Sequence, residues 1–247
     1  MTGEANRPTL KRFLSILPMV PSLMTLGGLI LLITLGIWQL QRLQWKTEII
    51  ATIEAQLALP ASPLPGGPID VDTWRFRKVI VQGRFHHDGE IHMYAANALG
   101  KPGYLIITPL ELPDGSYVFF NRGWVPLDKR LAETRPEGQI EGLVTLTGIT
   151  RKPWPQNTFV ADNEPGANIW FYGDLDGMAK FRGIVHYSPL FVEADETPNP
   201  GGLPIGGQSR LKISNDHLTY ALTWFSLAIA LLIVFGFYVA EQRRSGE

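Results

Sequence analysis

The sequence predicts an integral membrane protein in which two antiparallel transmembrane α-helices, N- and C-terminal, flank one mainly-β (α+β) extramembrane domain. Residues 21–40 and 218–240 carry no charged side chain, and each segment is long enough to cross roughly 30 Å of hydrocarbon. Between them, short apolar runs alternate with Asp-Gly and Pro-Asp-Gly turns, a pattern typical of antiparallel strands.

The first apolar segment is expected to be a transmembrane helix over residues 21–41. A cleavable signal peptide is the alternative, but no small-residue cleavage site follows the segment. Apolar residues keep a helical spacing to about residue 59, and the prolines that follow end the helix. The helix is therefore expected to continue beyond the membrane.

The short basic flanks of the two helices predict their orientation. Basic side chains precede the first helix and follow the second: Arg7, Lys11, Arg12, Arg243 and Arg244. Because short positive flanks stay in the cytoplasm, residues 1–20 and the tail at 241–247 are expected to be cytoplasmic. The β domain, residues 42–215, would then lie outside, with the second helix at residues 216–240. In a bacterium this means the inner membrane and the periplasm, and the lack of a transit peptide fits a bacterial protein.

The middle of the chain divides into strands, turns and short helices. A first hairpin is expected from strands at residues 79–85 and 91–94, joined by the His-Asp-Gly-Glu turn at residues 87–90. The other expected elements are strands at residues 104–112, 117–125, 143–150 and 186–192, and short helices at 128–134 and 175–181.

Composition excludes several classes of function. The chain has no cysteine, so disulfides, a thiolate nucleophile and thiolate metal sites are excluded. A net charge of −1 gives no reason to expect nucleic acid as a partner. The sequence has no Walker loop, no Gly-x-Ser-x-Gly elbow and no His-Glu-x-x-His motif. We therefore expect a protein that is not an enzyme.

The densest group of histidines lies around the first predicted hairpin. If that hairpin has a two-residue loop, His87 lies opposite Glu90, and His92 lies on the same face, while His86 points to the other face. Two imidazoles and a carboxylate could bind a metal ion. The alternative is a solvated hairpin tip without a function of its own.

A second group lies at the outer ends of the two helices. Polar and aromatic residues share one helical face on each helix, at matching depth: Trp38, Arg42 and Trp45, and His217, Tyr220 and Trp224. If the helices pair, the group suits a haem, because imidazole ligates iron, guanidinium meets a propionate and the rings cover the macrocycle. In the alternative interpretation, His217 only hydrogen-bonds a lipid headgroup or a loop.

The strands at residues 104–112 and 117–125 are expected to form a second hairpin through the Pro-Asp-Gly turn at residues 113–115, and the Asn-Arg-Gly-Trp-Val-Pro string at residues 121–126 closes it. Arg122 could pair with a carboxylate, and Gly123 suits a bulge or a close backbone approach. Both a structural anchor and a binding role are open for Arg122 at this point.

Several segments together resemble a known family. They are residues 35–42 with 45–46, 83–85, 103–104 with 108–110, 121–126, 168–171 with 174, and 215–225. In this order the segments resemble the Surfeit locus protein 1 family, the cytochrome c oxidase assembly factors that include the yeast Shy-type proteins. The resemblance covers most of the chain. Its most specific parts are the string at 121–126 and the His-Leu-x-Tyr-Ala-x-x-Trp-Phe string that begins at His217.

The resemblance implies a function that the composition does not. Such proteins assist the maturation of cytochrome c oxidase subunit I, and bacterial members bind haem a and pass it on from haem a synthase. His217 occupies the position of the family's haem-binding histidine. In one departure, this chain has Ala95, Ala96 and Asn97 where many members carry Pro-Arg, so no role of that arginine carries over.

Two other functions stay open at this stage. The protein could be a scaffold that stabilises subunit I without binding haem. It could also be a membrane-anchored metal carrier or enzyme that uses His86, His87 and His92.

Overall fold

The structure, a computed structural model, describes residues 19–97, 99–209 and 213–245. The described residues form two compact units: a helical unit within the bounds Met1–Ala51 and Ile213–Glu247, and a β domain within the bounds Thr52–Lys212. Most of the expected N-terminal segment, with its basic residues, lies outside the described residues.

The helical unit contains most of one long helix and the whole of another. Helix α2 is Met19–Ala58 and helix α4 is His217–Ser245. At about 1.5 Å per residue they measure about 60 and 44 Å, which exceeds the roughly 30 Å of a bilayer's hydrocarbon core. Both helices are long and apolar enough to cross a membrane. The fold class predicted from the sequence is therefore confirmed, with α2 ending just before Pro60.

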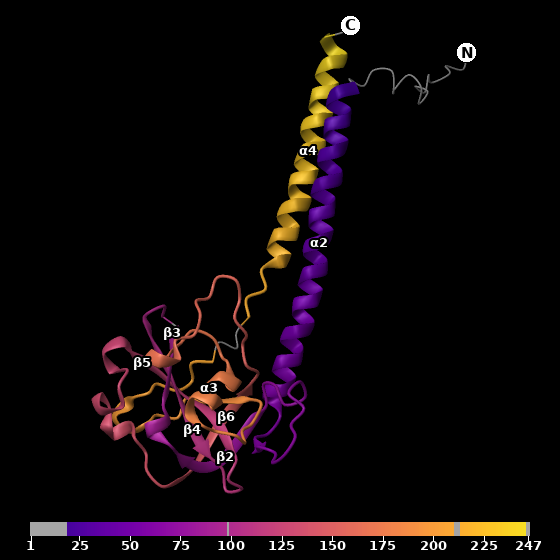
Figure 1. The fold of residues 1–247 in the computed structure, drawn as a ribbon. Helices are drawn as coiled ribbons and strands as arrows, with labels where there is room; N and C mark the ends of the chain where they lie inside the picture. Colours follow the sequence, from indigo (N-terminus) through magenta and orange to yellow (C-terminus); the bar gives the residue numbers. More distant parts are fainter. Residues whose placement is uncertain (1–18, 98, 210–212, 246–247) are drawn as a thin grey trace, which may run out of the picture. The chain divides into compact units, whose positions relative to one another are not determined.

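Small residues line the contact between the two helices. Helices α2 and α4 run side by side and antiparallel (Figure 1), and Ala221 and Ala228 are the buried residues of α4. A Cβ atom added to Gly36 would lie 2.5 Å from the ring of Phe225. Small residues allow two helix backbones to approach closely inside a membrane. The packing of this unit therefore depends on the lack of a side chain at Gly36.

The β domain contains one sheet. Its strands are β1 Ser62–Pro63, β2 Lys78–Phe85, β3 Ile91–Ala96, β4 Pro102–Glu111, β5 Tyr117–Pro126, β6 Leu143–Arg151, β7 Ile169–Trp170 and β8 Phe191–Ala194. They are ordered β1-β2-β6-β8-β5-β4-β3-β7, and β2 also pairs with β4. That additional pairing joins Arg84 to Glu111 and Phe85 to Leu110, and it closes β2, β6, β8, β5 and β4 into a ring.

The closed ring gives the domain two hydrophobic cores on opposite faces of its strands. One core contains Val79, Val81, Phe85, Leu110, Val118, Phe120 and Val192. The other packs the opposite face against helix α3, Leu175–Arg182. Consecutive residues Phe119 and Phe120 belong to different cores, as expected when successive side chains of a strand point to opposite faces. Strand β5 is therefore buried on both sides.

The first predicted hairpin is wrong. Both strands exist, but β2 and β3 pair with β4 and not with each other. They lie one after the other along the same edge of β4, and the segment between them is a 3-10 turn, His87–Gly89. The backbone N–H of His86 donates to the carbonyl of Pro109 at 2.9 Å, which keeps the chain on β4 through this turn.

Two other predicted elements differ in the structure. The short helix expected at residues 128–134 is a pair of 3-10 turns, Leu127–Lys129 and Ala132–Thr134. The strand expected at 186–192 begins only at Phe191, because Tyr187 makes a single bridge to Tyr117 before the ladder of β8 starts. The strands β4, β5 and β6 and the helix α3 lie where the sequence predicts them.

Candidate functional site

His217 is the first residue of α4, and it contacts α2 through a glutamine. Its Nδ1 atom lies 2.7 Å from Oε1 of Gln39, which is only 8% exposed. About two turns further along α2, the side-chain amide of Asn215 donates to the hydroxyl of Thr47 at 3.2 Å. The start of α4 is therefore fixed to α2 by two polar contacts within the helical unit.

The residues expected on α2 form a stack on that helix. The guanidinium carbon of Arg42 lies 4.8 Å from the ring centroid of Trp45 and 5.9 Å from that of Trp38. A cation over the face of an indole is attracted by the ring's electron density. Both tryptophans are about half exposed. Trp38 and Gln39 are consecutive and so point about 100° apart around the helix axis, whereas Arg42, three residues after Gln39, lies only about 60° from it.

The residues expected on α4 lie in different environments. Tyr220 is exposed, whereas the indole nitrogen of Trp224 is buried and has no hydrogen-bond partner among the described residues. A buried indole N–H normally finds an acceptor. The unpaired donor of Trp224 therefore marks a place in the helical unit where an additional acceptor would be stabilised.

The structure thus brings together only part of the predicted group. Arg42 contacts both Trp38 and Trp45, and His217 contacts α2, but the link between the helices is Gln39. Gln39 was not among the residues selected from the sequence. The signal that could have identified it is a carboxamide inside a segment of otherwise mostly apolar residues, because polar side chains within a membrane are costly and usually paired.

The histidines of the β domain do not converge on a metal site. His86 contacts the carboxylate of Glu111 at 2.7 Å, and Nε2 of His87 contacts the carbonyl of Ile140 at 2.8 Å. His92 is buried elsewhere on the sheet. No group of three or more His, Asp or Glu residues able to hold a metal occurs among the described residues. The metal-carrier interpretation of these histidines is therefore wrong, because it depended on a hairpin that does not form.

His92 is buried among cationic residues. Burial lowers the pKa of its imidazole to about 4, the charges of Arg130, Arg135 and Arg182 add to this effect, and Glu90 opposes it. Each of these causes except Glu90 disfavours a positive charge on the ring. His92 is consequently a neutral residue of the domain interior at physiological pH.

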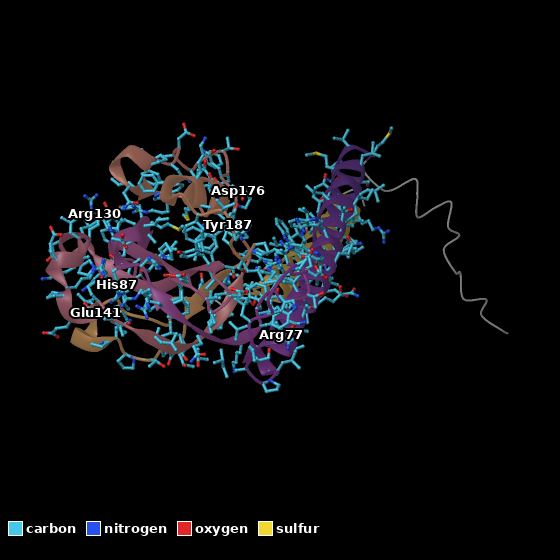
Figure 2. The ribbon with its side chains drawn as sticks, turned by 60° about the horizontal axis from the view of Figure 1, so that its bottom comes forward. Arg77, His87, Arg130, Glu141, Asp176 and Tyr187 are labelled. Atoms are coloured by element: carbon cyan, nitrogen blue, oxygen red, sulfur yellow. The ribbon has the colours of Figure 1, made fainter. Side chains whose placement is uncertain are left out.

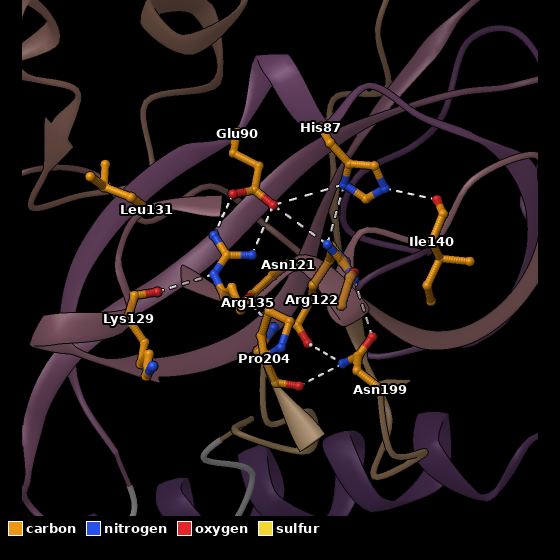
Figure 3. A network of polar contacts seen from close by, with 12 residues as sticks. His87, Glu90, Asn121, Arg122, Lys129, Leu131, Arg135, Ile140, Asn199 and Pro204 are labelled. Atoms are coloured by element: carbon orange, nitrogen blue, oxygen red, sulfur yellow. Dashed lines mark hydrogen bonds and ion pairs between the residues drawn. The ribbon is translucent and has the colours of Figure 1, made fainter. Parts of the chain in front are cut away.

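A buried network of charges lies next to the 3-10 turn between β2 and β3. Glu90, Arg122 and Arg135 are each at most 5% exposed. Arg135 binds both carboxylate oxygens of Glu90, with Nη1 to Oε1 at 3.0 Å, while Nη1 of Arg122 lies 3.5 Å from Oε1 (Figure 3). His87 completes the group, with Nδ1 3.8 Å from Oε1 of Glu90. Two guanidinium groups thus share one carboxylate.

The pKa values of the network follow from these contacts. Burial raises the pKa of Glu90, but His87 and the two guanidinium groups outweigh burial and lower it to about 2. Burial lowers the pKa of Arg122 to about 10, where Glu90 opposes and Arg135 reinforces the effect. Glu90 and Arg122 therefore remain charged at neutral pH, and their interaction is that of an ion pair.

Arg122 occupies an extra position in β5. Asn121 pairs with Ile107 and Gly123 with Ile106, so the arginine between them has no partner on β4. This bulge directs the guanidinium toward the carbonyl of Gly138, to which it donates. Bulges redirect a side chain and increase local twist. The structural interpretation of Arg122 as an anchor is therefore the one that the structure supports.

The rest of the string at residues 121–126 binds the loop that precedes α4 in sequence. Trp124 and Ile205 exchange two backbone hydrogen bonds, each of 2.9 Å. Gly123 has a φ of 121°, and a Cβ atom there would collide with the carbonyl oxygen of Ile205. Asn199 also contacts Arg122 and the carbonyl of Pro204 (Figure 3). The string therefore holds the segment around residues 199–205 against β5.

Another ionisable pair fixes helix α3. The hydroxyl of Tyr187 donates to the carboxylate of Asp176 at 2.6 Å (Figure 2). This hydrogen bond, together with burial and the carboxylate charges, raises the pKa of Tyr187 to about 12. The neutral phenol ties α3 to the segment that leads into β8. Its role is structural, because the hydrogen bond occupies the proton of the phenol.

Comparison with known proteins gives a consistent result. The sequence model described as the SURF1 family matches residues 27–229. The chain is 37% identical to human Surfeit locus protein 1 over 213 residues, which cover 79% of this chain and 70% of the human protein. It is 36% identical to a SURF1-like protein of Monosiga brevicollis over 225 residues, covering 86% and 84% of the two chains. Surfeit locus protein 1 of Rattus norvegicus is 36% identical over 79% of this chain and 68% of its own.

The chain belongs to the SURF1 family. The match to this family includes Gln39, Arg122 and His217, so it spans both helices and the β domain. The resemblance inferred from the sequence segments is thereby confirmed.

Proposed function

We propose that this SURF1 protein is an assembly factor for cytochrome c oxidase that binds haem a and assists its insertion into subunit I. Membership in the SURF1 family supports a role in cytochrome c oxidase assembly. The observation that carries the haem part of the proposal is the contact between His217 and Gln39. That contact engages one imidazole nitrogen and leaves the other without a hydrogen bond to the described residues.

The donor set of the helical unit fits a haem. A bound haem would supply an iron centre that takes a nitrogen ligand, and it would bring two negatively charged propionates. In this proposal His217 provides the nitrogen, and Arg42 provides a cation for a carboxylate. The unpaired indole N–H of Trp224 is a further donor that lacks an acceptor among the described residues.

The aromatic residues have supporting roles in this proposal. Trp38 and Trp45 hold the guanidinium of Arg42 between two rings, which reduces the number of orientations that it samples. Together with Tyr220, they offer flat apolar surface near the site. None of these residues needs to perform bond-making chemistry, so the proposed activity is binding and transfer without catalysis.

The proposal also names partners and a location. The protein would receive haem a from haem a synthase and deliver it to subunit I while it is anchored in a lipid bilayer. We propose the bacterial inner membrane, with both termini cytoplasmic and the β domain periplasmic. Two helices able to span a membrane support the anchoring, and the basic flanks support the orientation.

The test is the pigment of the purified protein. Protein made in cells that synthesise haem a should show the red-shifted absorption of that cofactor, and His217→Ala should lose most of it. His186→Ala, which changes an exposed imidazole of the β domain, is the matched control and should retain the pigment. An unchanged amount and spectrum in His217→Ala would remove His217 as the ligand.

A second candidate function is a scaffold that stabilises subunit I without haem. It is favoured by the β domain, where the buried Arg122 and Arg135 both bind Glu90 and form an ion cluster of the domain interior. Co-purification with subunit I, combined with no haem affinity of the protein in detergent, would support the scaffold.

A further inference from the structure

We infer that Gln39 is the positioning residue of His217: its side-chain carbonyl accepts the Nδ1 proton, and this fixes Nε2 as the nitrogen that faces a ligand. The inference rests on the proposed function for its consequences in haem binding. The tautomer itself is a property of the protein alone and can be measured without any ligand.

His217 and Gln39 make a close polar contact between α4 and α2. Nδ1 of His217 and Oε1 of Gln39 are 2.7 Å apart, a short distance for a hydrogen bond between nitrogen and oxygen. A carbonyl oxygen only accepts, so the imidazole must donate at this position. A neutral imidazole carries one proton, and therefore Nε2 holds the lone pair. A metal ion binds only a nitrogen with a free lone pair.

The side-chain amide of Gln39 is buried. Gln39 is one of the few buried polar residues of the described chain, and it belongs to a segment expected to cross the membrane. Burying a polar side chain at such a position costs free energy unless the side chain has a hydrogen-bond partner. Because His217 is that partner, the carbonyl of the amide and the Nδ1–H of the imidazole satisfy each other.

Contacts between α2 and α4 on both sides of Gln39 hold Gln39 and His217 in place. One turn before Gln39, Gly36 packs against the ring of Phe225. Two turns after it, Thr47 binds the side chain of Asn215. These two contacts fix the separation and the register of α2 and α4 on both sides of Gln39. The amide is therefore held by the helix packing and in turn orients the ring of His217.

This arrangement resembles the outer shell of many metal sites. A ligand histidine commonly donates its other N–H to an oxygen, which sets the ring orientation and raises the basicity of the ligand nitrogen. Loss of such a partner typically lowers metal affinity by about 10–100-fold. We therefore expect Gln39 to tune the site, although it does not touch the ligand.

The decisive experiment measures the tautomer of His217 without haem. Full-length protein labelled with ¹⁵N-histidine is examined by NMR in a lipid nanodisc, and the signals of His217 are assigned by their loss in His217→Ala. The expected result is a protonated Nδ1 and an unprotonated Nε2. Gln39→Leu should give a mixture of both tautomers. A wild-type ring protonated at Nε2 would overturn the inference, because the glutamine would then present its NH₂ group.

Haem-loaded protein gives the second readout. Gln39→Leu should lower haem affinity by about 10–100-fold, and Gln39→Glu should lower the midpoint potential, because a carboxylate acceptor makes the imidazole a stronger donor. Gln41→Leu removes an amide on an exposed face of the same helix and should change neither quantity. Unchanged affinity and potential in both Gln39 variants would overturn the positioning role.

The two proposals fail in different ways. If wild-type protein binds no haem but shows the Nδ1 tautomer that Gln39→Leu abolishes, the haem function fails and the positioning of His217 stands. If haem binds through His217 and the Gln39 variants behave like wild type, the haem function stands and the role of Gln39 fails.

Discussion

Glu90 neutralises only one of the two guanidinium groups that are buried beside it. Its carboxylate is bound at both oxygens by Arg135 and at one by Arg122. Removing one member of a buried ion cluster leaves the others without compensation, which typically costs about 3–5 kcal/mol. We therefore expect Glu90→Gln to lower the free energy of unfolding by roughly that amount, measured by denaturant titration of the full-length protein in detergent.

The matched control for this prediction is Glu111→Gln. Glu111 also pairs with a side-chain nitrogen, that of His86, but both side chains are about 40% exposed. An exposed pair contributes only about 0–1 kcal/mol. Equal losses of stability in the two variants would contradict the prediction that the buried cluster of Glu90 stabilises the fold more than the exposed pair of Glu111.

The loss of stability caused by Glu90→Gln should depend on pH. Because the pKa of Glu90 is lowered from 4.5 to about 2 on folding, its stabilising effect is complete above pH 4.5 and is lost as the pH falls toward about 2. The stability difference between wild type and Glu90→Gln should thus be full at pH 7 and shrink below pH 4.5.

Some site residues could be predicted from the sequence because their chemistry is local. Arg42 lies three and four residues from its two tryptophans, a spacing that puts all three on one helical face. Gln39 could not be paired with His217 in the same way. The partners are 178 positions apart, and no helical spacing relates them until the packing of the two helices is known.

At the scale of elements, the pairing of α2 and α4 depends on Gly36. Its missing side chain leaves room for the ring of Phe225, whereas Gly27, on the same helix, has no atom within 4 Å of its hypothetical Cβ. We expect Gly36→Leu to separate the helices and Gly27→Leu to leave them paired. Gly36 is the more sensitive position because close backbone approach is what favours packing in lipid.

Cysteine cross-linking measures this effect directly. The chain has no native cysteine, so Thr47→Cys and Asn215→Cys, at two side chains in contact, form a pair free of background. Oxidation should give a high yield of disulfide in the otherwise wild-type chain and with Gly27→Leu, and a several-fold lower yield with Gly36→Leu. A high yield in all three chains would show that the helix contact does not need the glycine.

Strands were easier to predict than the way in which they pair. The alternation of apolar and polar residues locates β2, β4, β5 and β6 to within a few residues. The Asp-Gly signal at residues 88–89 suggested a hairpin, but the pairing of Arg84 and Phe85 with the end of β4 closes the ring instead. Ring closure is a long-range choice, and local turn chemistry cannot reveal it.

At the scale of the whole molecule, the hydrophobic segments determine the membrane helices through length and charge alone. The ring of the β domain is different, because β5 and β8 are parallel neighbours separated by about 65 residues of chain. Parallel pairing needs a long connection, here one that includes β6, β7 and α3. The arrangement therefore depends on packing between distant segments, which the sequence pattern does not encode directly.

The orientation in the membrane is the remaining property of the whole chain that charge predicts. If the positive flanks stay in the cytoplasm, a cysteine in the β domain and one at the end of α4 must lie on opposite sides. Phe159→Cys, at a fully exposed position, and Ser245→Cys, the last residue of α4, provide the two probes. In intact bacterial spheroplasts, a membrane-impermeant maleimide should label Phe159→Cys and should reach Ser245→Cys only after the membrane is permeabilised. The reverse pattern would place the β domain in the cytoplasm. It would also remove haem delivery from the outer side of the membrane, because His217 begins α4 at the end opposite Ser245.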